Sequence, residues 1–367
     1  MRTWEPLSLN DSGDPPSFDD VMLVPKYTTV KSRLDPSIEL QSQLGGSSLD
    51  IPIISSPMDT VTGPEMAISL GTRGAMGIVH RFMSPSDQVK EVAKIVSFNQ
   101  SYSNAYAPVV PAIGIGKAER LRVKALYQEF GTNIDWFAID VANGYSSITK
   151  DMTDWIKNET NGAIPLMVGN VATGDGFAFL AESGADAVRV GIGGGSICKT
   201  RIMTGFGVPT LASIVDCYKM KVSSDKFNMV SIVADGGIKY PQDLVKSLAA
   251  GADAIMGGRI FAGTLESPGE VAIINGKKMK AYRGMASKEV QEDTRGGLKP
   301  GTCAEGVLTY MPLKGKAHYV LDEFCGGLRS AMTYANARNI TELRQNSLFY
   351  RLTQSALEES HAFGTKK

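Results

Sequence analysis

One cysteine of this chain follows a glycine-rich run, at a place where a thiol can act as a nucleophile. The run is VGIGGGSICKTR, residues 190–201, and its thiol belongs to Cys198. Glycine accepts backbone angles and close approaches that other residues do not, so we expect a loop pressed against an anion or a ring. The run is not a Walker phosphate loop, because no glycine precedes Lys199. Loop amides and the nearby Arg201 favour the anionic form of a thiol, which adds readily to an electron-poor carbon.

Two other glycine-rich stretches are suited to hold a phosphate. They are ADGG, with Asp235, Gly236 and Gly237, and GGR, with Gly257, Gly258 and Arg259. Both follow short apolar runs, and backbone amides at such turns bind anions. Together with the hydroxyl of Ser196, they predict a phosphate cradle, a carboxylate and a thiol on adjacent loops. This combination suits a phosphorylated ligand that is attacked by a nucleophile.

Eight short apolar runs are the elements that must position these residues. They begin at Ile51, Ala75, Pro108, Trp136, Pro165, Ala187, Met229 and Ala254. A helix-like stretch follows each run, for example residues 86–99 and 241–252. Such alternation indicates βα units, and eight of them predict a (β/α)8 TIM barrel with its chemistry at the C-terminal ends of the strands. The thiol loop then follows strand six, and the two phosphate stretches end strands seven and eight.

Two segments depart from a bare barrel. Residues 1–50 form an N-terminal arm before the first strand, and a polar segment from Ala272 to about Lys316 follows the eighth. The second segment is too polar and too often broken by glycine for a core, so we expect a mobile flap at about 283–306. Four of its residues are expected to form a solvated, charged face: Lys288, Glu289, Glu292 and Asp293. The whole chain, 1–367, is expected to be one barrel domain.

The composition excludes several classes of partner. Lys plus Arg and Asp plus Glu number 38 each, so no basic field gathers nucleic acid or an anionic membrane. No run of about 18 apolar residues is present, and the first residues lack the apolar centre of a signal peptide. We therefore expect a cytoplasmic protein. The four cysteines lack CxxC spacing and are expected to be thiols, with Cys217, Cys303 and Cys325 as small buried residues.

Longer motifs resemble one family along nearly the whole chain. These are SFDDVMLVP, SSPMDTVT, GGGSICKTR, ADGGI, LESPGE, YRGM and GGLRSAMTY. Together they resemble the IMP dehydrogenase and GMP reductase family. The resemblance implies that Cys198 attacks C2 of a purine mononucleotide to form a thioimidate, that Thr200 acts in the second half-reaction and that Glu305 is the acid/base partner. It assigns nucleotide binding to Ser196, Asp235, Gly236, Gly237, Gly257, Gly258, Tyr282, Gly284, Met285 and Gly306.

The same resemblance implies a nicotinamide cofactor, a monovalent cation and a homotetramer. Cofactor-binding positions are matched by Asp140, Val141, Ala142, Asn143, His80 and Arg81, although a structural role is an equal alternative for His80. The cation, K⁺, is expected on the loop of Gly193, Gly195 and Cys198. One residue departs from the family pattern, which usually has proline at position 194. Gly194 is therefore expected to loosen the thiol loop.

Two reactions remain open, reduction of GMP to IMP and ammonia with NADPH, or oxidation of IMP to XMP with NAD. Most dehydrogenases carry CBS modules where this chain has only SFNQSYSNAYA, and they activate water with an Arg-Tyr pair on a longer flap. Here Arg295 precedes Gly296. The flap length, DVANGYS and VHRF resemble the reductase, whereas ADGGIKYPQDL, SSPMDTVT and the tail 358–363 resemble the dehydrogenase. The sequence favours a reductase without CBS modules, with a purine-nucleotide sensor as a third possibility that intact Cys198, Thr200 and Glu305 disfavour.

Overall fold

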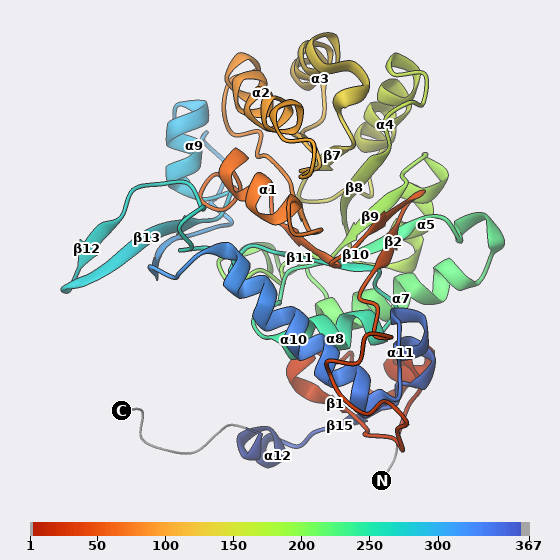
Figure 1. Ribbon diagram of the computed structural model, residues 1–367. Coiled ribbons are helices and arrows are strands. Elements are labelled where there is room, and N and C mark those ends of the chain that lie inside the picture. Colours follow the sequence, from red (N-terminus) through yellow and green to blue (C-terminus); the bar gives the residue numbers. More distant parts are fainter. Residues whose placement is uncertain (1–2, 361–367) are drawn as a thin grey trace.

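The computed structural model describes residues 3–360, and at its centre eight parallel strands form one sheet (Figure 1). In chain order they are β4 (Ile53–Ser55), β5 (Met76–Gly77), β6 (Ala112–Ile113), β7 (Phe137–Asp140), β8 (Leu166–Val171), β9 (Ala187–Val190), β10 (Ser231–Asp235) and β11 (Ala254–Gly257). Each of the eight apolar runs overlaps one of these strands. First and last strand pair in parallel, with Ile54 opposite Met256.

The sheet closes on itself between β5 and β6. Val79, just beyond β5, forms a parallel bridge with Pro111. Its N–H donates to the carbonyl of Val110 at 2.9 Å, and its carbonyl accepts from the N–H of Ala112 at 2.8 Å. The predicted (β/α)8 barrel is confirmed. Closure brings the carboxyl ends of all eight strands to one rim, where the chemistry of this fold is placed.

Helices surround the barrel and begin where the sequence supplies caps. Those that follow the barrel strands are α1 (Pro64–Gly71), α2 (Pro85–Ser101), α3 (Lys117–Phe130), α4 (Ser147–Glu159), α5 (Gly174–Glu182), α6 (Thr200–Thr204), α7 (Thr210–Val222), α8 (Pro241–Ala249) and α10 (Ala317–Ala335). For example, the hydroxyl of Ser84 accepts from the N–H of Asp87 at 3.1 Å, and Pro85 opens α2. Helices α2 and α8 confirm the two stretches expected to be helical.

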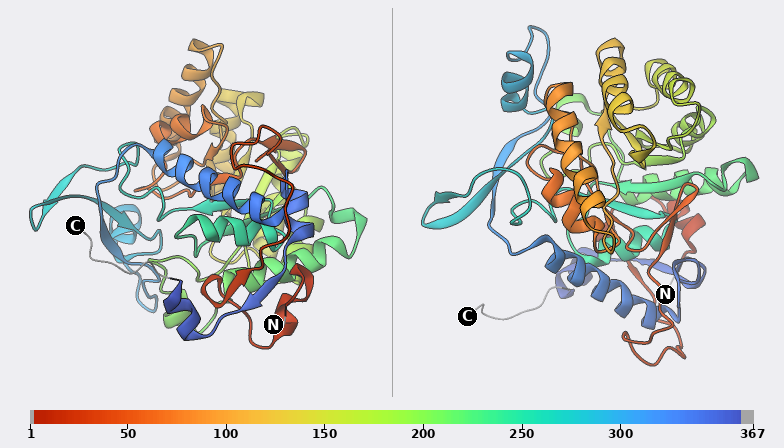
Figure 2. Two further views of the ribbon diagram at one scale, coloured as in Figure 1. Left: turned by 60° about the horizontal axis from the view of Figure 1, so that its bottom comes forward. Right: turned by 45° about the horizontal axis from the view of Figure 1, so that its top comes forward.

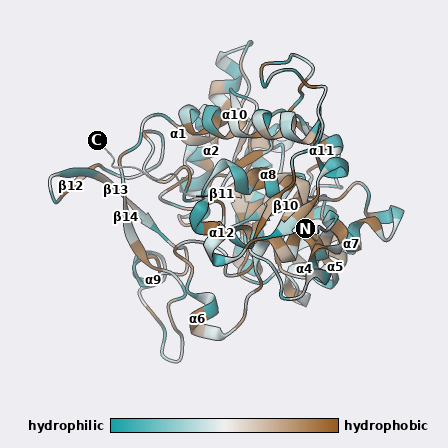
Figure 3. Ribbon diagram, turned by 90° about the horizontal axis from the view of Figure 1, so that it is seen from below, coloured by the Kyte–Doolittle hydropathy of each residue, from teal (hydrophilic) through white to brown (hydrophobic). Residues whose placement is uncertain are grey.

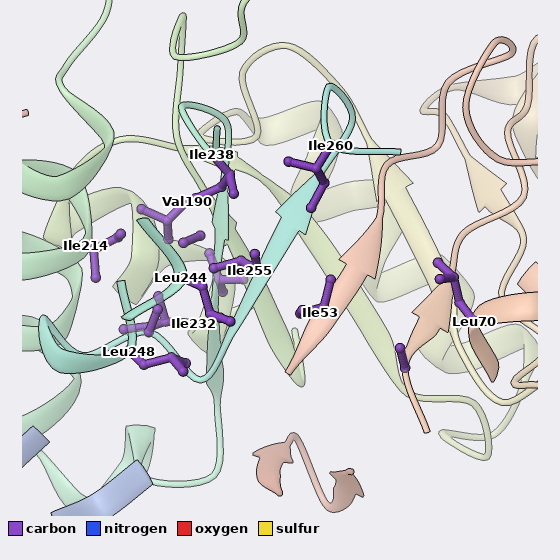
Figure 4. Packing of buried hydrophobic residues seen from close by; sticks show 14 of the residues in the cluster. Ile53, Leu70, Val190, Ile214, Ile232, Ile238, Leu244, Leu248, Ile255 and Ile260 are labelled. Carbon is purple, nitrogen blue, oxygen red and sulfur yellow. The ribbon is translucent and has the colours of Figure 1, made fainter. Parts of the chain in front are cut away.

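Buried side chains form two clusters, one on each side of the barrel wall. The inner cluster takes at least one residue from every barrel strand: Ile54, Met76, Ala112, Ala138, Met167, Ala187, Val233, Ala254 and Met256. These side chains fill the barrel, so it is a packed core rather than a pore. The outer cluster packs strands against helices, as Ile232, Leu244 and Leu248 do in Figure 4. In Figure 3, hydrophobic residues gather at the centre around β10 and β11.

The N-terminal arm lies against the C-terminal elements (Figure 2). It holds the 3-10 helices η1 (Pro6–Ser12) and η2 (Phe18–Asp20) and the strands β1 (Val21–Leu23), β2 (Ser42–Leu44) and β3 (Ser47–Leu49). Strand β1 pairs antiparallel with β15 (Phe349–Arg351), and β2 with β3. The ring of Phe18 lies under the cradle, where a Cβ at Gly237 would come within 3.2 Å of it. The arm thus supports the rim of the barrel.

The segment after β11 is more regular than a glycine-broken flap suggested. It forms the antiparallel sheet of β12 (Ala272–Ile274), β13 (Lys277–Arg283) and β14 (Leu308–Pro312), with helix α9 (Lys288–Arg295) between the last two strands. This sheet projects from the barrel in Figure 1. Strands β13 and β14 pair through their backbones over five positions. The pattern of polar residues in the sequence did not predict this pairing. The remaining elements are η3 (Gly131–Asn133), η4 (Asp225–Phe227), α11 (Ile340–Asn346) and α12 (Gln354–Glu359).

Over residues 3–360, no helix combines the length and apolar character that crossing a membrane requires. Residues 361–363 of the tail that resembles the dehydrogenase lie outside the described part of the chain.

Candidate active site

A cavity of about 590 Å³ opens at the C-terminal rim of the barrel. This volume is ordinary for a small-molecule site, which spans roughly 300–1,000 Å³. Its wall includes every site residue expected from the sequence except two: Arg81, Asp140, Val141, Ala142, Gly193, Gly195, Ser196, Cys198, Thr200, Asp235, Gly236, Gly237, Gly257, Gly258, Tyr282, Gly284, Met285, Glu305 and Gly306. The two residues that do not line it are His80 and Asn143. The expected thiol, phosphate and cofactor residues therefore share one cavity.

The thiol loop is bound to the segment that ends the flap. Cys198 and Gly306 form an antiparallel bridge. The N–H of Lys199 donates to the carbonyl of Glu305 at 2.7 Å, and the N–H of Val307 donates to the carbonyl of Ile197 at 3.2 Å. Residues about a hundred positions apart in sequence are thus held side by side at the thiol.

Two glycines allow this close approach. A Cβ on Gly306 would lie 3.0 Å from the backbone nitrogen of Ser287 and 3.1 Å from the Cα of Gly284. A Cβ on Gly284 would lie 3.3 Å from the carbonyl oxygen of Ile197. Any larger residue would push the flap away from the thiol loop.

A short chain of hydrogen bonds links the thiol to a carboxylate. The thiol of Cys198 donates to the hydroxyl of Thr200 at 3.1 Å, and that hydroxyl donates to Oε2 of Glu305 at 2.8 Å. Thr200 opens α6, and Glu305 comes from the flap segment bound to the thiol loop. A proton on the thiol can therefore reach the carboxylate through one hydroxyl. We call Cys198, Thr200 and Glu305 the proton relay.

The phosphate stretches form a cradle at the ends of β10 and β11. Gly236 and Gly237 have φ of +95° and +80°, in the left-handed region that other residues rarely adopt. A Cβ on Gly258 would come within 3.1 Å of the Tyr282 hydroxyl. Burial raises the pKa of Tyr282, whereas hydrogen bonding with Ser196 and the charge of Arg259 oppose that rise. The cradle therefore combines glycine backbone, which carries no side chain in the way of a ligand, with the hydroxyls of Tyr282 and Ser196.

A buried arginine joins two aspartates of the cavity wall. Nη1 of Arg189 donates to Oδ1 of Asp140 at 2.7 Å, and Nη2 donates to Oδ2 of Asp235 at 2.8 Å. Asn170 also donates to Asp235, at 2.8 Å. Burial alone would lower the pKa of Arg189, but the two carboxylates raise it above its ordinary value. This bridge was not expected from the sequence, although a charge within the apolar strand AVRVGI signals a buried partner.

Removing this arginine is expected to destabilise the fold strongly. Arg189→Met leaves Asp235 without its cationic partner and Asp140 with only Arg81, at 4.0 Å, and breaking a buried pair in this way costs about 3–5 kcal/mol. Arg189→Lys keeps the charge and should lose less. Urea unfolding followed by circular dichroism measures both variants. A loss below about 1 kcal/mol for Arg189→Met would contradict the bridging role.

The cofactor-side residues expected from the sequence divide into two groups. Arg81 lines the cavity and donates through Nη2 to the carbonyl of Asp140 at 3.1 Å. His80 is 9% exposed and off the cavity wall, with burial as the main cause of its lowered pKa. Asn143 is exposed and accepts from the N–H of Tyr145 at 3.1 Å, within a turn. In the structure, Asn143 thus stabilises its own turn, and His80 is buried away from the cavity.

Gly194 fits closely against a neighbouring threonine. A Cβ at this position would lie 2.4 Å from Oγ1 of Thr210, the first residue of α7. That oxygen is buried and has no hydrogen-bond partner in the described part of the chain. Proline carries a Cβ, so the usual family residue would require Thr210 to turn away. Glycine at position 194 therefore avoids a clash with the Thr210 side chain.

An arginine also fixes the flap helix. Arg283, the last residue of β13, donates through Nε to Asp59 at 2.9 Å and through Nη1 to Asp293 of α9 at 2.7 Å. Gln291 of α9 lines the cavity, a position the sequence did not single out. Lys288 and Glu292 form an ion pair on the exposed side of α9 at 3.5 Å, in line with the charged face expected there. The side chain of Arg295 lies outside the described parts of the structure.

The other cysteines differ from one another. Cys217 is fully buried, and burial raises its pKa well above the usual value. Cys325 is half-buried, with a pKa raised to about 11, mainly by burial. Cys303 is exposed on the flap, so the expectation of a buried residue is wrong there. Its neighbours are polar or small, and the preceding turn faces solvent.

Comparison with known proteins shows one family. The model of the family described as IMP dehydrogenase / GMP reductase domain matches residues 16–363. The inosine-5′-monophosphate dehydrogenase of Borreliella burgdorferi is 33% identical, over 94% of this chain and 96% of that protein. That of Cryptosporidium parvum is 36% identical, over 94% of each chain.

A solved structure shares the fold. The crystal structure of a GMP reductase variant from Trypanosoma brucei in complex with guanosine 5′-monophosphate superposes with a TM-score of 0.88. The match covers 98% of this chain and 100% of that chain at 23% identity. At this identity the likeness concerns the fold.

Proposed function

The chain belongs to the IMP dehydrogenase / GMP reductase family of purine nucleotide oxidoreductases, and from that premise we propose that it is a GMP reductase. The reaction is the reductive deamination of GMP to IMP and ammonia, with NADPH as reductant. Catalytic roles fall to Cys198, Thr200 and Glu305. The observation that carries the proposal is the proton relay, which links the thiol to Glu305 through Thr200.

The relay suits deamination because one proton serves two steps. As the thiolate of Cys198 forms, its proton passes through Thr200 to Glu305. The thiolate adds to C2 of the purine and forms a C–S bond. The relay then returns the proton to the amine at C2, the C–N bond breaks and ammonia leaves. What remains on Cys198 is a thioimidate, formed without water.

The second half-reaction releases the thiol. Reduced nicotinamide, when bound, supplies the hydride that C2 of the thioimidate accepts. The C–S bond then breaks, IMP departs, and the thiolate of Cys198 takes up one proton from solvent to restore the thiol. Throughout, Ser196, Tyr282 and the glycines of the cradle hold the 5′-phosphate, and Asp235 faces the ribose.

Residues on the cavity wall fit a nicotinamide. Three buried polar atoms there have no hydrogen-bond partner within residues 3–360: Oδ1 of Asn170, an acceptor, and the Nε atoms of Arg81 and Arg189, both donors. A carboxamide offers the complementary donor and acceptor. Asp140 and Arg81 complete this side of the cavity. The proposal therefore places the nicotinamide between the relay and Asp140.

A monovalent cation and a homotetramer complete the proposal. The cation, K⁺, would be held by carbonyls of Gly193, Gly195 and Cys198. The carbonyl of Gly195 accepts one hydrogen bond, from the N–H of Cys198 at 3.1 Å, and keeps a second lone pair for an ion. Large apolar side chains such as Ile202 (83% exposed) and Phe206 (77% exposed) give neighbouring subunits a surface to cover.

IMP dehydrogenase is the second candidate, and the relatives favour it. Two proteins with that name are 33% and 36% identical to nearly the whole chain. Its reaction needs a base that takes a proton from water to hydrolyse the thioimidate. No tyrosine lies between positions 283 and 306 to assist Arg295, and an arginine serves as base only if its pKa falls far below about 12.

Steady-state kinetics in both directions test the proposal. Absorbance at the band of reduced nicotinamide is followed with GMP plus NADPH and, separately, with IMP plus NAD. We expect steady loss of NADPH with GMP, and with IMP at most one slow burst of reduced cofactor. Steady turnover with IMP and none with GMP would establish the dehydrogenase instead, and Arg295→Ala would then test its base.

A further inference from the structure

Arg259 brings an unpaired positive charge to the cradle. It follows Gly258 directly after β11, is exposed and lines the cavity. Its guanidinium makes no hydrogen bond or ion pair with any side chain in the described part of the chain. An arginine stays charged at every physiological pH, so this charge is always present.

Each of the other basic side chains on the cavity wall has a nitrogen within 4.0 Å of a carboxylate oxygen. Arg189 donates to Asp140 and Asp235 at 2.7 and 2.8 Å. Nε of Arg81 lies 4.0 Å from Asp140, and Nζ of Lys239 lies 2.8 Å from Asp19. Of the basic residues on the described wall, Arg259 is therefore the one whose charge is available for a ligand.

On the cavity wall, the surroundings of Arg259 offer only neutral donors, and the neighbouring cation Lys314 lies off that wall. Gly258 lies under the Tyr282 hydroxyl, and the glycine backbone of the cradle continues from it. Nζ of Lys314 donates to the carbonyls of Arg259 and Ile260, both at 3.0 Å, and so holds this turn in place. Lys314 has a pKa lowered to about 8, first by burial and then by the charge of Arg259. A fixed turn thus presents one cation beside hydroxyls and amides.

We propose that Arg259 binds the 5′-phosphate of the nucleotide and selects its dianion. This inference rests on the proposed function only in that the ligand is a purine mononucleotide. Amides and hydroxyls gain little from the second negative charge of the phosphate, whereas a guanidinium gains directly by charge-assisted, often bidentate, hydrogen bonds. Arg259 therefore sets both the affinity for mononucleotides over nucleosides and its dependence on pH.

The pH dependence follows from the phosphate. Its second ionisation lies near pH 6, at about the value of other phosphate monoesters. Affinity of the wild-type protein should rise as pH increases through this value and level off above it, because Arg259 does not titrate there. Without the guanidinium the rise should be several-fold smaller.

Calorimetric titration with GMP, IMP and guanosine tests the inference on four proteins: wild type, Arg259→Gln, Arg259→Lys and Lys226→Gln. For Arg259→Gln at pH 7.5 we expect Kd to rise about 10- to 100-fold for both mononucleotides, the usual effect of losing a charged hydrogen bond. Guanosine should lose less than about threefold. Arg259→Lys should fall between, and Lys226→Gln, which removes an exposed cation that is paired with Glu182 away from the cavity wall, should stay within about threefold of wild type.

The outcomes separate this inference from the proposed function. Equal losses for guanosine and GMP would show a structural role and overturn it, as would unchanged Kd values in Arg259→Gln. If the protein oxidises IMP and does not reduce GMP, the reductase assignment fails, yet the Arg259 effect on binding of either mononucleotide stands. A wild-type protein that binds neither mononucleotide would overturn both.

Discussion

Cys198→Ala is expected to abolish turnover, by at least about 10⁴-fold, while Kd for GMP stays within about tenfold of wild type. Turnover is lost because no other residue within the relay can form the C–S bond. Binding survives because the cradle of Ser196, Tyr282 and the glycines does not involve the thiol. Rapid-mixing kinetics measure the first effect and calorimetry the second.

One outcome for Cys198→Ala would contradict the covalent role of the thiol. If binding is lost together with activity, Cys198 holds the loop that it shares with Gly306 and the covalent route is wrong. Cys303→Ala is the matched control, since that thiol is exposed on the flap and takes no part in the relay. It should retain near wild-type kcat and KM.

Breaking the relay should have the second-largest effect. Thr200→Val and Glu305→Gln each remove one transfer of a proton, and such losses lower kcat by about 10²- to 10⁴-fold. KM should change little, because neither side chain belongs to the cradle. Thr200→Ser restores the hydroxyl and should recover most of the rate.

Residues that act as one relay give non-additive losses. The double variant Thr200→Val/Glu305→Gln should therefore be about as slow as the slower single variant. Losses that multiply instead would show that the hydrogen bonds between Cys198, Thr200 and Glu305 do not form one path. Stopped-flow measurement of ammonia release in a single turnover follows the step directly.

The barrel could be predicted from the sequence because each buried strand is a short apolar run. Such a run is recognised from its own residues, without knowledge of its partners. The runs that start at Ile51 and Ala254 predicted β4 and β11, and their parallel pairing closes one side of the ring. The position of Cys198 on the catalytic rim followed from the same pattern. Its hydrogen bonds did not, because Glu305 comes from a segment about a hundred residues away.

Other features depend on contacts that no local pattern encodes. Arg189 bridges Asp140 and Asp235 only because three separate strands end at one rim. The sheet of β13 and β14 forms because the two strands pair across the flap, although β13 is rich in lysine. The close fit that explains a glycine at position 194 involves Thr210, which is distant in the sequence. These residues were invisible or ambiguous until the fold placed their partners.

The exposure of Cys303 also could not be predicted from the residue type. A cysteine's usual burial is a general tendency, whereas its position is decided by the turn that carries it. Here the turn lies between α9 and β14 and faces solvent, so the thiol does too. The chemically similar Cys217 is buried because α7 packs against the barrel.

The stoichiometry of one reaction tests the central claim most directly. GMP and NADPH are supplied in excess to the wild-type protein, and ammonia, IMP, XMP and oxidised cofactor are measured together over time. The proton relay and the thioimidate on Cys198 predict one ammonia and one IMP for each NADPH consumed, with no XMP. Absence of ammonia from GMP, together with steady XMP from IMP and NAD, would contradict the assignment as a GMP reductase.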